Sequence, residues 1–213
     1  MMRSGIQLLI LALVVLLWNG TTRAQSVETY VGHQRAGIDL MWYKFFQNRS
    51  GQPGPFLFFS RTRASTTYEK APTAFGTTNA ISYNFPNGVG IVGVGSFVNN
   101  GFVPKAGVQL VRSKGDFLFF GWLVADLVEK GNLDLFGLLR YQPHLTANWR
   151  LFAQLELFPV YQPSSGYWSL TKRIRLGAKW HQWAAGWMTD LNQSGNQEWT
   201  TSHLVGGFLR YNF

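Results

Sequence analysis

The stretch from Tyr167 to Trp180, YWSLTKRIRLGAKW, decides the fold of this chain. Its even positions are apolar from Trp168 to Trp180, with Lys172 as the exception, and its odd positions are polar, basic or small. Side chains alternate between the two faces of a β-strand, so this period of two predicts one long strand with an apolar face and a basic face. The apolar face begins and ends with tryptophan.

The spacing of these two tryptophans fits a lipid bilayer. Twelve residues at ~3.3 Å each, tilted by ~45°, separate them by about 28 Å along the membrane normal. Segments 133–142, 149–158 and 183–191 alternate in the same way. A soluble sandwich also alternates, but its apolar face is a core that rarely ends in Trp or Tyr on strand after strand. We therefore expect an aromatic girdle at the lipid interface, formed by Tyr141, Trp149, Trp168, Trp180 and Trp183.

Turn-forming clusters rich in Gly, Asn and Pro divide the rest of the chain at a matching interval. They leave eleven clear strands, at about 36–47, 56–64, 78–85, 89–98, 104–113, 116–128, 132–142, 146–160, 167–180, 182–191 and 201–213. Membrane barrels of single bacterial chains have even strand numbers. A short strand within 26–33, where Val27, Thr29 and Val31 alternate, would make twelve. The sequence predicts an all-β, antiparallel up-and-down transmembrane barrel of twelve strands, with ten strands as the alternative.

The N-terminus has the pattern of a cleaved secretory signal peptide. Arg3 precedes an apolar run over 6–18, and Thr22 and Ala24 place small residues at the two positions that specify cleavage. The run is shorter than the ~20 residues of a transmembrane helix. We expect a signal peptide at 1–24, an N-terminal segment or short first strand at 25–35, and the barrel at 36–213.

Composition and charge exclude several functional classes. The 213 residues include 46% hydrophobic and 16% aromatic residues but no cysteine. Disulfide frameworks, thiolate zinc sites and cysteine nucleophiles are thereby excluded. The formal charge of +9 becomes +7 once Arg3 and Arg23 leave with the signal peptide. An exported protein does not meet chromosomal DNA, so we expect no nucleic-acid partner.

The C-terminus carries a family resemblance. Leu209, Tyr211 and Phe213 alternate on one face of the last strand and end the chain with an aromatic residue. This resembles the C-terminal assembly signal of Gram-negative outer-membrane β-barrel proteins. The resemblance implies a location in the bacterial outer membrane, contact with membrane lipid and lipopolysaccharide, and docking on the barrel-assembly machinery during biogenesis. It matches no characterised subfamily, and this fold does not by itself define a function.

The inward positions of the expected strands predict a charged lumen. They include Asp126, Asp134, Arg140, Arg150, Glu156, Arg173, Arg175, Lys179, Asp190 and Arg210. One interpretation is a plugged interior, where arginines and carboxylates of different strands neutralise one another. The other is a narrow pathway whose positive excess, centred on Arg173, Arg175 and Lys179, favours small anionic or amphipathic solutes.

Catalysis is the weakest interpretation. The histidines at 33, 144 and 181 lie in expected turns or before the first clear strand, and His203 and Ser202 point to opposite faces of one strand. Asp126 and Asp134 suit a divalent cation or an acid/base pair, but salt bridges to basic neighbours are the stronger expectation. We expect no catalytic residue, no metal and no cofactor.

Three hypotheses follow for the function. The first is a small passive channel or solute-binding barrel with a positively biased lumen. The second is a plugged structural or accessory barrel that partners an envelope complex. The third is a lipid-modifying outer-membrane enzyme.

Arg61 and Arg63 lie on one face of their strand and either guard the outer mouth or pair with Glu69.

Overall fold

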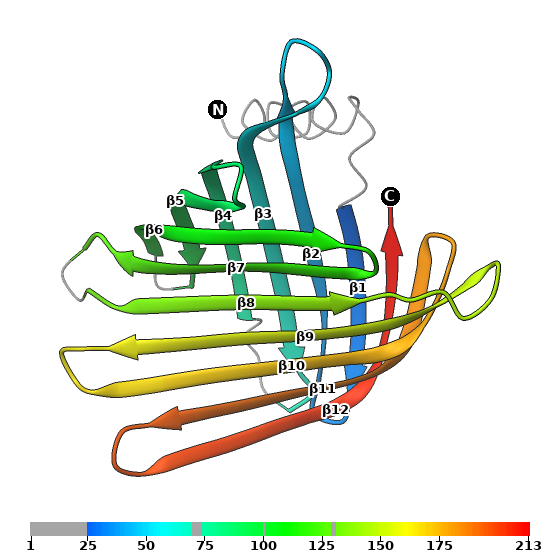
Figure 1. The fold of residues 1–213 in the computed structure, drawn as a ribbon. Coiled ribbons are helices and arrows are strands. Elements are labelled where there is room, and N and C mark those ends of the chain that lie inside the picture. Colours follow the sequence, from blue (N-terminus) through cyan, green and yellow to red (C-terminus); the bar gives the residue numbers. More distant parts are fainter. Residues whose placement is uncertain (1–24, 70–73, 100, 129–130) are drawn as a thin grey trace, which may run out of the picture.

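A computed structural model describes residues 25–69, 74–99, 101–128 and 131–213, and within them every regular element is a β-strand. The signal peptide expected at 1–24 lies outside the described residues. The strands form one closed antiparallel barrel (Figure 1). They are β1 (Gln25–Gly32), β2 (Arg35–Gln47), β3 (Pro53–Thr67), β4 (Ala74–Asn84), β5 (Val89–Val98), β6 (Gly101–Lys114), β7 (Phe117–Asp126), β8 (Leu133–Tyr141), β9 (Trp149–Gln162), β10 (Tyr167–Trp180), β11 (Trp183–Gly195) and β12 (Trp199–Asn212).

Each strand pairs with its neighbours in sequence, and β1 closes the ring by pairing with both β2 and β12. In the closing pair Ser26 lies opposite Asn212 and Gly32 lies opposite Gly206. The prediction of a twelve-strand barrel is confirmed, and β1 is the short strand expected within 26–33. Closure leaves no unpaired strand edge, which is the condition for a sheet to lie in lipid.

The barrel has two rims. We call the one that holds Gln25 and Phe213 the terminal rim; the short connections at 85–88, 115–116 and 181–182 lie at the same end. The opposite end, with the connections at 33–34, 163–166 and 196–198, we call the loop rim. The amide of Phe213 donates to the carbonyl of Gln25 at 3.1 Å, so the last residue is held against the first described one.

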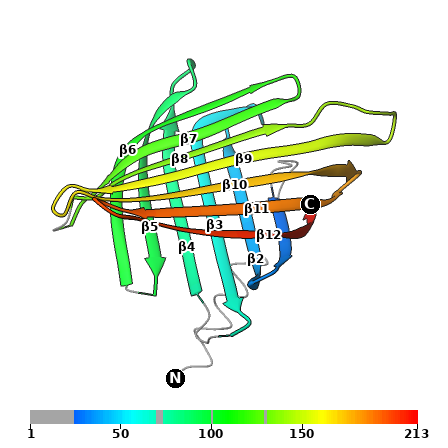
Figure 2. The same ribbon diagram turned by 90° about the horizontal axis from the view of Figure 1, so that it is seen from below.

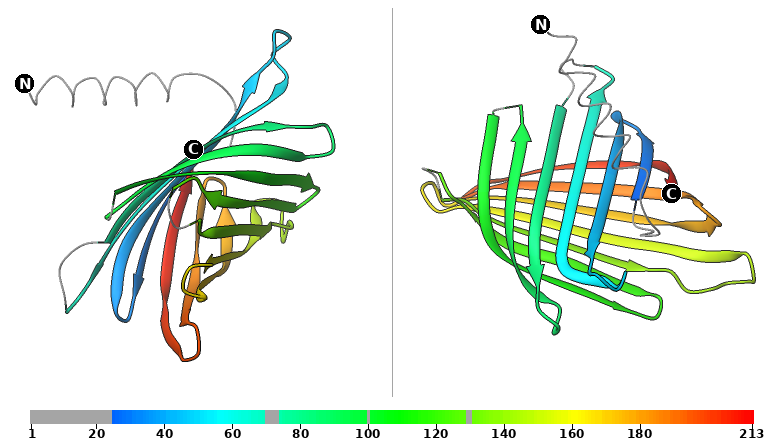
Figure 3. Two further views of the ribbon diagram at one scale, coloured as in Figure 1. Left: turned by 90° about the vertical axis from the view of Figure 1, so that its left-hand side faces the viewer. Right: turned by 90° about the horizontal axis from the view of Figure 1, so that it is seen from above.

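The barrel is flattened rather than round. In Figure 1, β1–β5 run steeply across the direction of β7–β12, and Figures 2 and 3 show these two groups as facing walls. Inward-facing glycines mark places where neighbouring strands approach too closely for a side chain. A Cβ on Gly177 would lie 2.1 Å from the carbonyl oxygen of Ala185, and one on Gly107 would lie 2.0 Å from that of Leu123. Glycine at such points allows a sheet to bend sharply.

The outward face is apolar around the whole circumference. Among its exposed side chains are Leu40, Ile81, Ile91, Val108, Leu123, Leu135, Leu139, Ile174, Leu176, Trp187, Val205 and Leu209. Soluble monomers rarely expose contiguous apolar surface of this extent. Among the described residues there is no helix that is both long and apolar enough to span a membrane.

The interior is packed with side chains, as in the narrower transmembrane barrels. One buried cluster lies between β2–β5 and β7–β8 and consists of Met41, Leu57, Phe59, Ala80, Val92, Val94, Phe120, Trp122, Val124, Phe136 and Leu138. A second cluster joins β1, β9, β11 and β12 through Tyr30, Phe152, Ala184, Met188, Leu204 and Phe208. Charged side chains fill the space beside these clusters.

Candidate functional site

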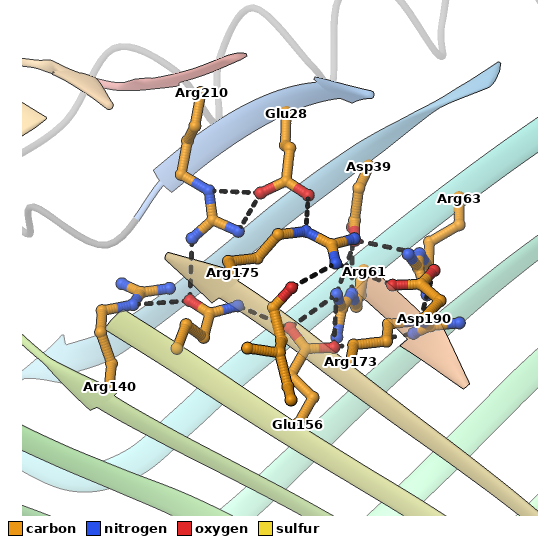
Figure 4. A network of polar contacts seen from close by, with 12 residues as sticks. Glu28, Asp39, Arg61, Arg63, Arg140, Glu156, Arg173, Arg175, Asp190 and Arg210 are labelled. Atoms are coloured by element: carbon orange, nitrogen blue, oxygen red, sulfur yellow. Dashed lines mark hydrogen bonds and ion pairs between the residues drawn. The ribbon is translucent and has the colours of Figure 1, made fainter. Parts of the chain in front are cut away.

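An ion-pair network lies inside the barrel and joins its opposite walls (Figure 4). We call it the lumen network. Six arginines and four carboxylates form it, an excess of two positive charges: Glu28, Asp39, Arg61, Arg63, Arg140, Glu156, Arg173, Arg175, Asp190 and Arg210. Because alternate residues of each strand face inward, side chains of β1–β3 and of β8–β12 meet in it.

Glu28 on β1 holds one end of the network. Its Oε1 accepts from Nε of Arg175 at 2.9 Å, and its Oε2 accepts from Nε of Arg210 at 2.9 Å. Nη1 of Arg175 also donates to Oδ1 of Asp190 at 2.7 Å. All four side chains are at most 3% exposed. Buried charges of this kind are tolerated because each carboxylate is held by guanidinium hydrogen bonds.

The other end of the network joins opposite walls. Arg61 on β3 donates from Nε and Nη2 to the two oxygens of Asp39 on β2, at 3.0 and 2.5 Å. The same Nη2 lies 3.0 Å from Glu156 on β9. In the ring order, six steps separate β3 from β9, so the Arg61–Glu156 contact spans the lumen from one wall to the other.

Gln154 links the two ends. Its Oε1 accepts from Arg140 at 2.8 Å and from Arg210 at 2.9 Å, while its Nε2 donates to Glu156 at 2.7 Å. The amide therefore joins two cations to a carboxylate. Hydrogen-bonded connections of this kind make the network one continuous structure rather than a set of isolated pairs.

Three arginines on the loop-rim side share carboxylates already used by deeper arginines. Arg63 contacts Asp39 at 2.9 Å, Arg173 lies 3.5 Å from Asp190 and 3.6 Å from Glu156, and Arg35 lies 3.6 Å from Asp190. Their side chains are 19%, 22% and 29% exposed, respectively. The network therefore has fewer carboxylates than cations: the three arginines on the loop-rim side share carboxylates with deeper arginines, and Arg140, toward the terminal rim, donates to the amide oxygen of Gln154.

Aromatic side chains close the remaining part of the lumen. The ring of Phe59 on β3 stacks on that of Phe120 on β7 with centroids 5.2 Å apart, and it meets Trp122 edge-on at the same distance. On the terminal-rim side of this stack, a void of about 20 Å³ lies between Phe59, Phe120 and Arg140. In the described state, the lumen network and this stack together block the barrel.

A larger cavity of about 310 Å³ lies on the loop-rim side of the stack, and we call it the vestibule. Its floor and walls are mostly apolar. Thr78 and Ser96 add two hydroxyl groups, and its charged side chains are those of Arg61, Arg63, Arg173, Lys105 and Asp134. Nζ of Lys105 contacts Asp134 and lies 2.8 Å from Asp126. Asp126 and Asp134, which the sequence made candidates for a divalent cation, therefore form salt bridges with Lys105, as the stronger expectation predicted.

The structure places the predicted lumen residues in three groups. Arg140, Glu156, Arg173, Arg175, Asp190 and Arg210 belong to the lumen network, and Asp126 and Asp134 belong to the Lys105 cluster. Arg150 and Lys179 lie opposite each other on β9 and β10 near the terminal rim, outside the network, and Arg150 contacts His144. Arg61 and Arg63 bind Asp39, so the alternative pairing with Glu69 is wrong.

Sequence reasoning missed Glu28, Asp39 and Lys105. Glu28 and Asp39 lie opposite each other in the β1–β2 register. Their inward position was readable from the alternation of Val27, Thr29 and Val31, which places Glu28 on the face away from lipid. The partners of these residues on distant strands have no sequence signal, because contacts across the lumen depend on how far the barrel is flattened.

The expected girdle residues lie near the ends of their strands. Tyr141, Trp149, Trp180 and Trp183 are at the terminal rim, where Tyr141 stacks on Phe117, and Trp168 contacts Tyr161 at the loop rim. Leu209 and Tyr211 face outward on β12. Contact of these residues with lipid and with the assembly machinery stays a prediction.

Comparison with known proteins supports the fold. No protein-family model matches the sequence, and no curated protein matches it. Among solved structures, the KdgM porin is similar with a TM-score of 0.50 and 15% identity, covering 89% of this chain and 99% of that one. KdgM in complex with disordered oligogalacturonate gives a TM-score of 0.50 and 13% identity at the same coverage. LpxR from Salmonella typhimurium is similar over 89% of this chain and 100% of that one, with a TM-score of 0.45 and 9% identity. The chain has the porin-like fold of an outer-membrane β-barrel protein, as its last strand predicted.

Proposed function

We propose that this chain works in the bacterial outer membrane as a narrow solute-binding channel that favours small anions. The observation that carries the proposal is the positive excess of the lumen network, which joins the opposite walls of the barrel. Any solute that crosses must pass these arginines. A ring of basic side chains attracts anions and repels cations in a pore, and the effect is strong where little water screens it.

The fold neighbours are compatible with this proposal. One of the KdgM structures holds oligogalacturonate, whose sugar units carry carboxylates. The present chain has a blocked lumen in its described state, so the solutes we propose are smaller than an oligosaccharide. Passage requires the Arg61–Glu156 contact to open, because that contact joins the opposite walls.

A plugged structural barrel is the second candidate. The stack of Phe59 on Phe120 and the small void on its terminal-rim side favour this alternative, because they leave little space for a solute. The lipid-modifying enzyme has less support. Ser202 and His203 pair regularly with Asn192 and Leu191 in the described β12, so their side chains point to opposite faces of the strand and do not form a nucleophile–base pair.

Ion selectivity of the refolded mature protein in a planar bilayer tests the proposal. Under a tenfold salt gradient, discrete currents with a reversal potential on the anion side are expected. Arg173→Gln removes a partly exposed lumen cation and should shift the reversal potential toward zero. Arg112→Gln, a terminal-rim substitution outside the lumen network, is the matched control and should leave the potential unchanged. Cation preference in the unaltered protein would refute the proposal, and a silent bilayer despite verified folding would favour the plugged barrel.

A further inference from the structure

The vestibule joins an aromatic pocket to incompletely paired arginines. Its apolar lining includes Phe59, Val94, Trp122, Phe136 and Phe158. Phe136 contacts both Trp122 and Phe158, with centroids 5.2 and 6.3 Å apart, so aromatic rings form a continuous wall. A volume of about 310 Å³ is at the lower end of the range of small-molecule sites.

The cations that face this pocket have unused hydrogen-bonding capacity. Nη1 of Arg63 is buried and donates no hydrogen bond, and Nε of Arg173 likewise has none. The contacts of Arg173 with Asp190 and Glu156 are 3.5 and 3.6 Å long, against 2.7 and 2.9 Å for the contacts of Arg175 with Asp190 and Glu28. A buried donor without a partner is costly, and an anionic oxygen would satisfy it.

A buried acceptor adds a second requirement. Asp134 lines the vestibule with its side chain 7% exposed, and its Oδ1 accepts no hydrogen bond although Lys105 contacts the other oxygen. A hydroxyl group on a ligand would donate to this atom. The carboxylate also disfavours a ligand that carries negative charge at both ends.

We infer that the vestibule binds a single-ring aromatic monocarboxylate, and that a hydroxyl substituent on the ring strengthens the binding. The ring would lie against Trp122, Phe136 and Phe158, and the carboxylate would accept from Arg63 and Arg173. This inference rests on the proposed function, because it assumes that the anion-favouring lumen is where the solute binds. It adds the chemical class of that solute.

Isothermal titration of the refolded protein in detergent, with sodium benzoate and 4-hydroxybenzoate as probes, tests the inference. Saturable one-to-one binding is expected, tighter for 4-hydroxybenzoate. Benzamide has the same shape without the charge and should bind about tenfold more weakly, because a charge-assisted hydrogen bond is lost. Acetate lacks the ring and should give no saturable heat.

Substitutions in the vestibule locate the site. Arg63→Gln and Arg173→Gln should each weaken benzoate binding about tenfold, whereas Arg112→Gln should not change it. Asp134→Asn should reduce the advantage of 4-hydroxybenzoate over benzoate. Each variant is first checked for the folded, heat-sensitive gel band; if Arg63→Gln does not fold, Arg63→Lys keeps the charge and should still weaken binding because it lacks the planar fork.

The outcomes separate this inference from the channel proposal. Benzoate binding that depends on Arg63 and Arg173 in a protein that passes no current would support the site and refute the channel. Anion-selective currents without saturable benzoate binding would overturn the site and leave the channel. Equal binding of benzoate and benzamide would also overturn it, since the arginines would then have no part in recognition.

Discussion

Two arginines in neighbouring inward positions on β10 have different roles. Arg175 is 3% exposed and is held between Glu28 and Asp190, whereas Arg173 is 22% exposed and lines the vestibule with long ion-pair distances. The alternating pattern predicted that both side chains face the lumen. It did not separate their roles, because the partners come from β1, β9 and β11, and no local sequence signal records contacts between those strands. The structural role of Arg175 and the exposed role of Arg173 make different predictions.

Replacing Arg175 with Met should destabilise the barrel by about 3–5 kcal/mol, since Glu28 and Asp190 would lose a shared buried cation. Arg173→Gln should cost much less, because that side chain is partly solvated and weakly paired. Urea unfolding in lipid vesicles, followed by the mobility difference between folded and unfolded protein on a gel, measures both. Equal loss of stability in the two variants would contradict the structural role of Arg175 and the exposed role of Arg173.

At the scale of elements, the sequence predicted strands well where one face meets lipid. Alternation located β9 and β10 closely, but the strand expected at 56–64 extends as β3 over Pro53–Thr67. Backbone pairing continues toward the rims, where side chains no longer need to alternate, so the pattern ends before the strand does. The sequence alone did not establish the first strand, because only three alternating residues within 26–33 indicate it. Its place in the barrel depends on closure with β12, which is a property of the ring.

Close approach of neighbouring strands predicts an asymmetry between glycines. Gly177→Val should prevent or strongly impair folding, because a Cβ would lie 2.1 Å from the carbonyl oxygen of Ala185. Gly93→Val on the outward face of β5 meets no atom within 4 Å and should be tolerated. The yield of folded, heat-sensitive protein after refolding into detergent measures the difference. Normal folding of the Gly177 variant would show that the strands are farther apart than described.

The β1–β12 register predicts which engineered cysteines can be joined. The chain has no native cysteine, so Thr29→Cys combined with Leu209→Cys gives a clean pair at directly opposed positions. A disulfide needs Cβ atoms about 3.5–4.5 Å apart. Mild oxidation should therefore crosslink this pair. It should not crosslink the control pair of Thr29→Cys with Val205→Cys, because Val205 lies four residues before Leu209 on β12. Crosslinking of the offset pair alone would mean that the closing register is wrong.

At the scale of the whole molecule, side chains from opposite walls of a flattened barrel meet inside it. Sequence projection predicted a charged and aromatic interior and left open whether the charges pair or line a route. In the structure they pair, yet the pairing is incomplete on the side of the vestibule. Flattening decides this outcome, because it brings β3 within reach of β7 and β9. It depends on the bends of the whole ring, so no single segment predicts it.

The central claim is that the Arg61–Glu156 contact across the lumen limits flow through the barrel. Single-channel conductance of the double variant Arg61→Gln with Glu156→Gln, compared with the unaltered protein, tests it most directly. The double substitution keeps the net charge but removes the ion pair between the opposite walls; Glu156→Gln keeps the side-chain size, and Arg112→Gln, which shortens an arginine in the same way outside the lumen, is the control. We predict a several-fold rise in conductance or in the open fraction of time for the double variant alone. Unchanged conductance in a correctly folded double variant would contradict the account.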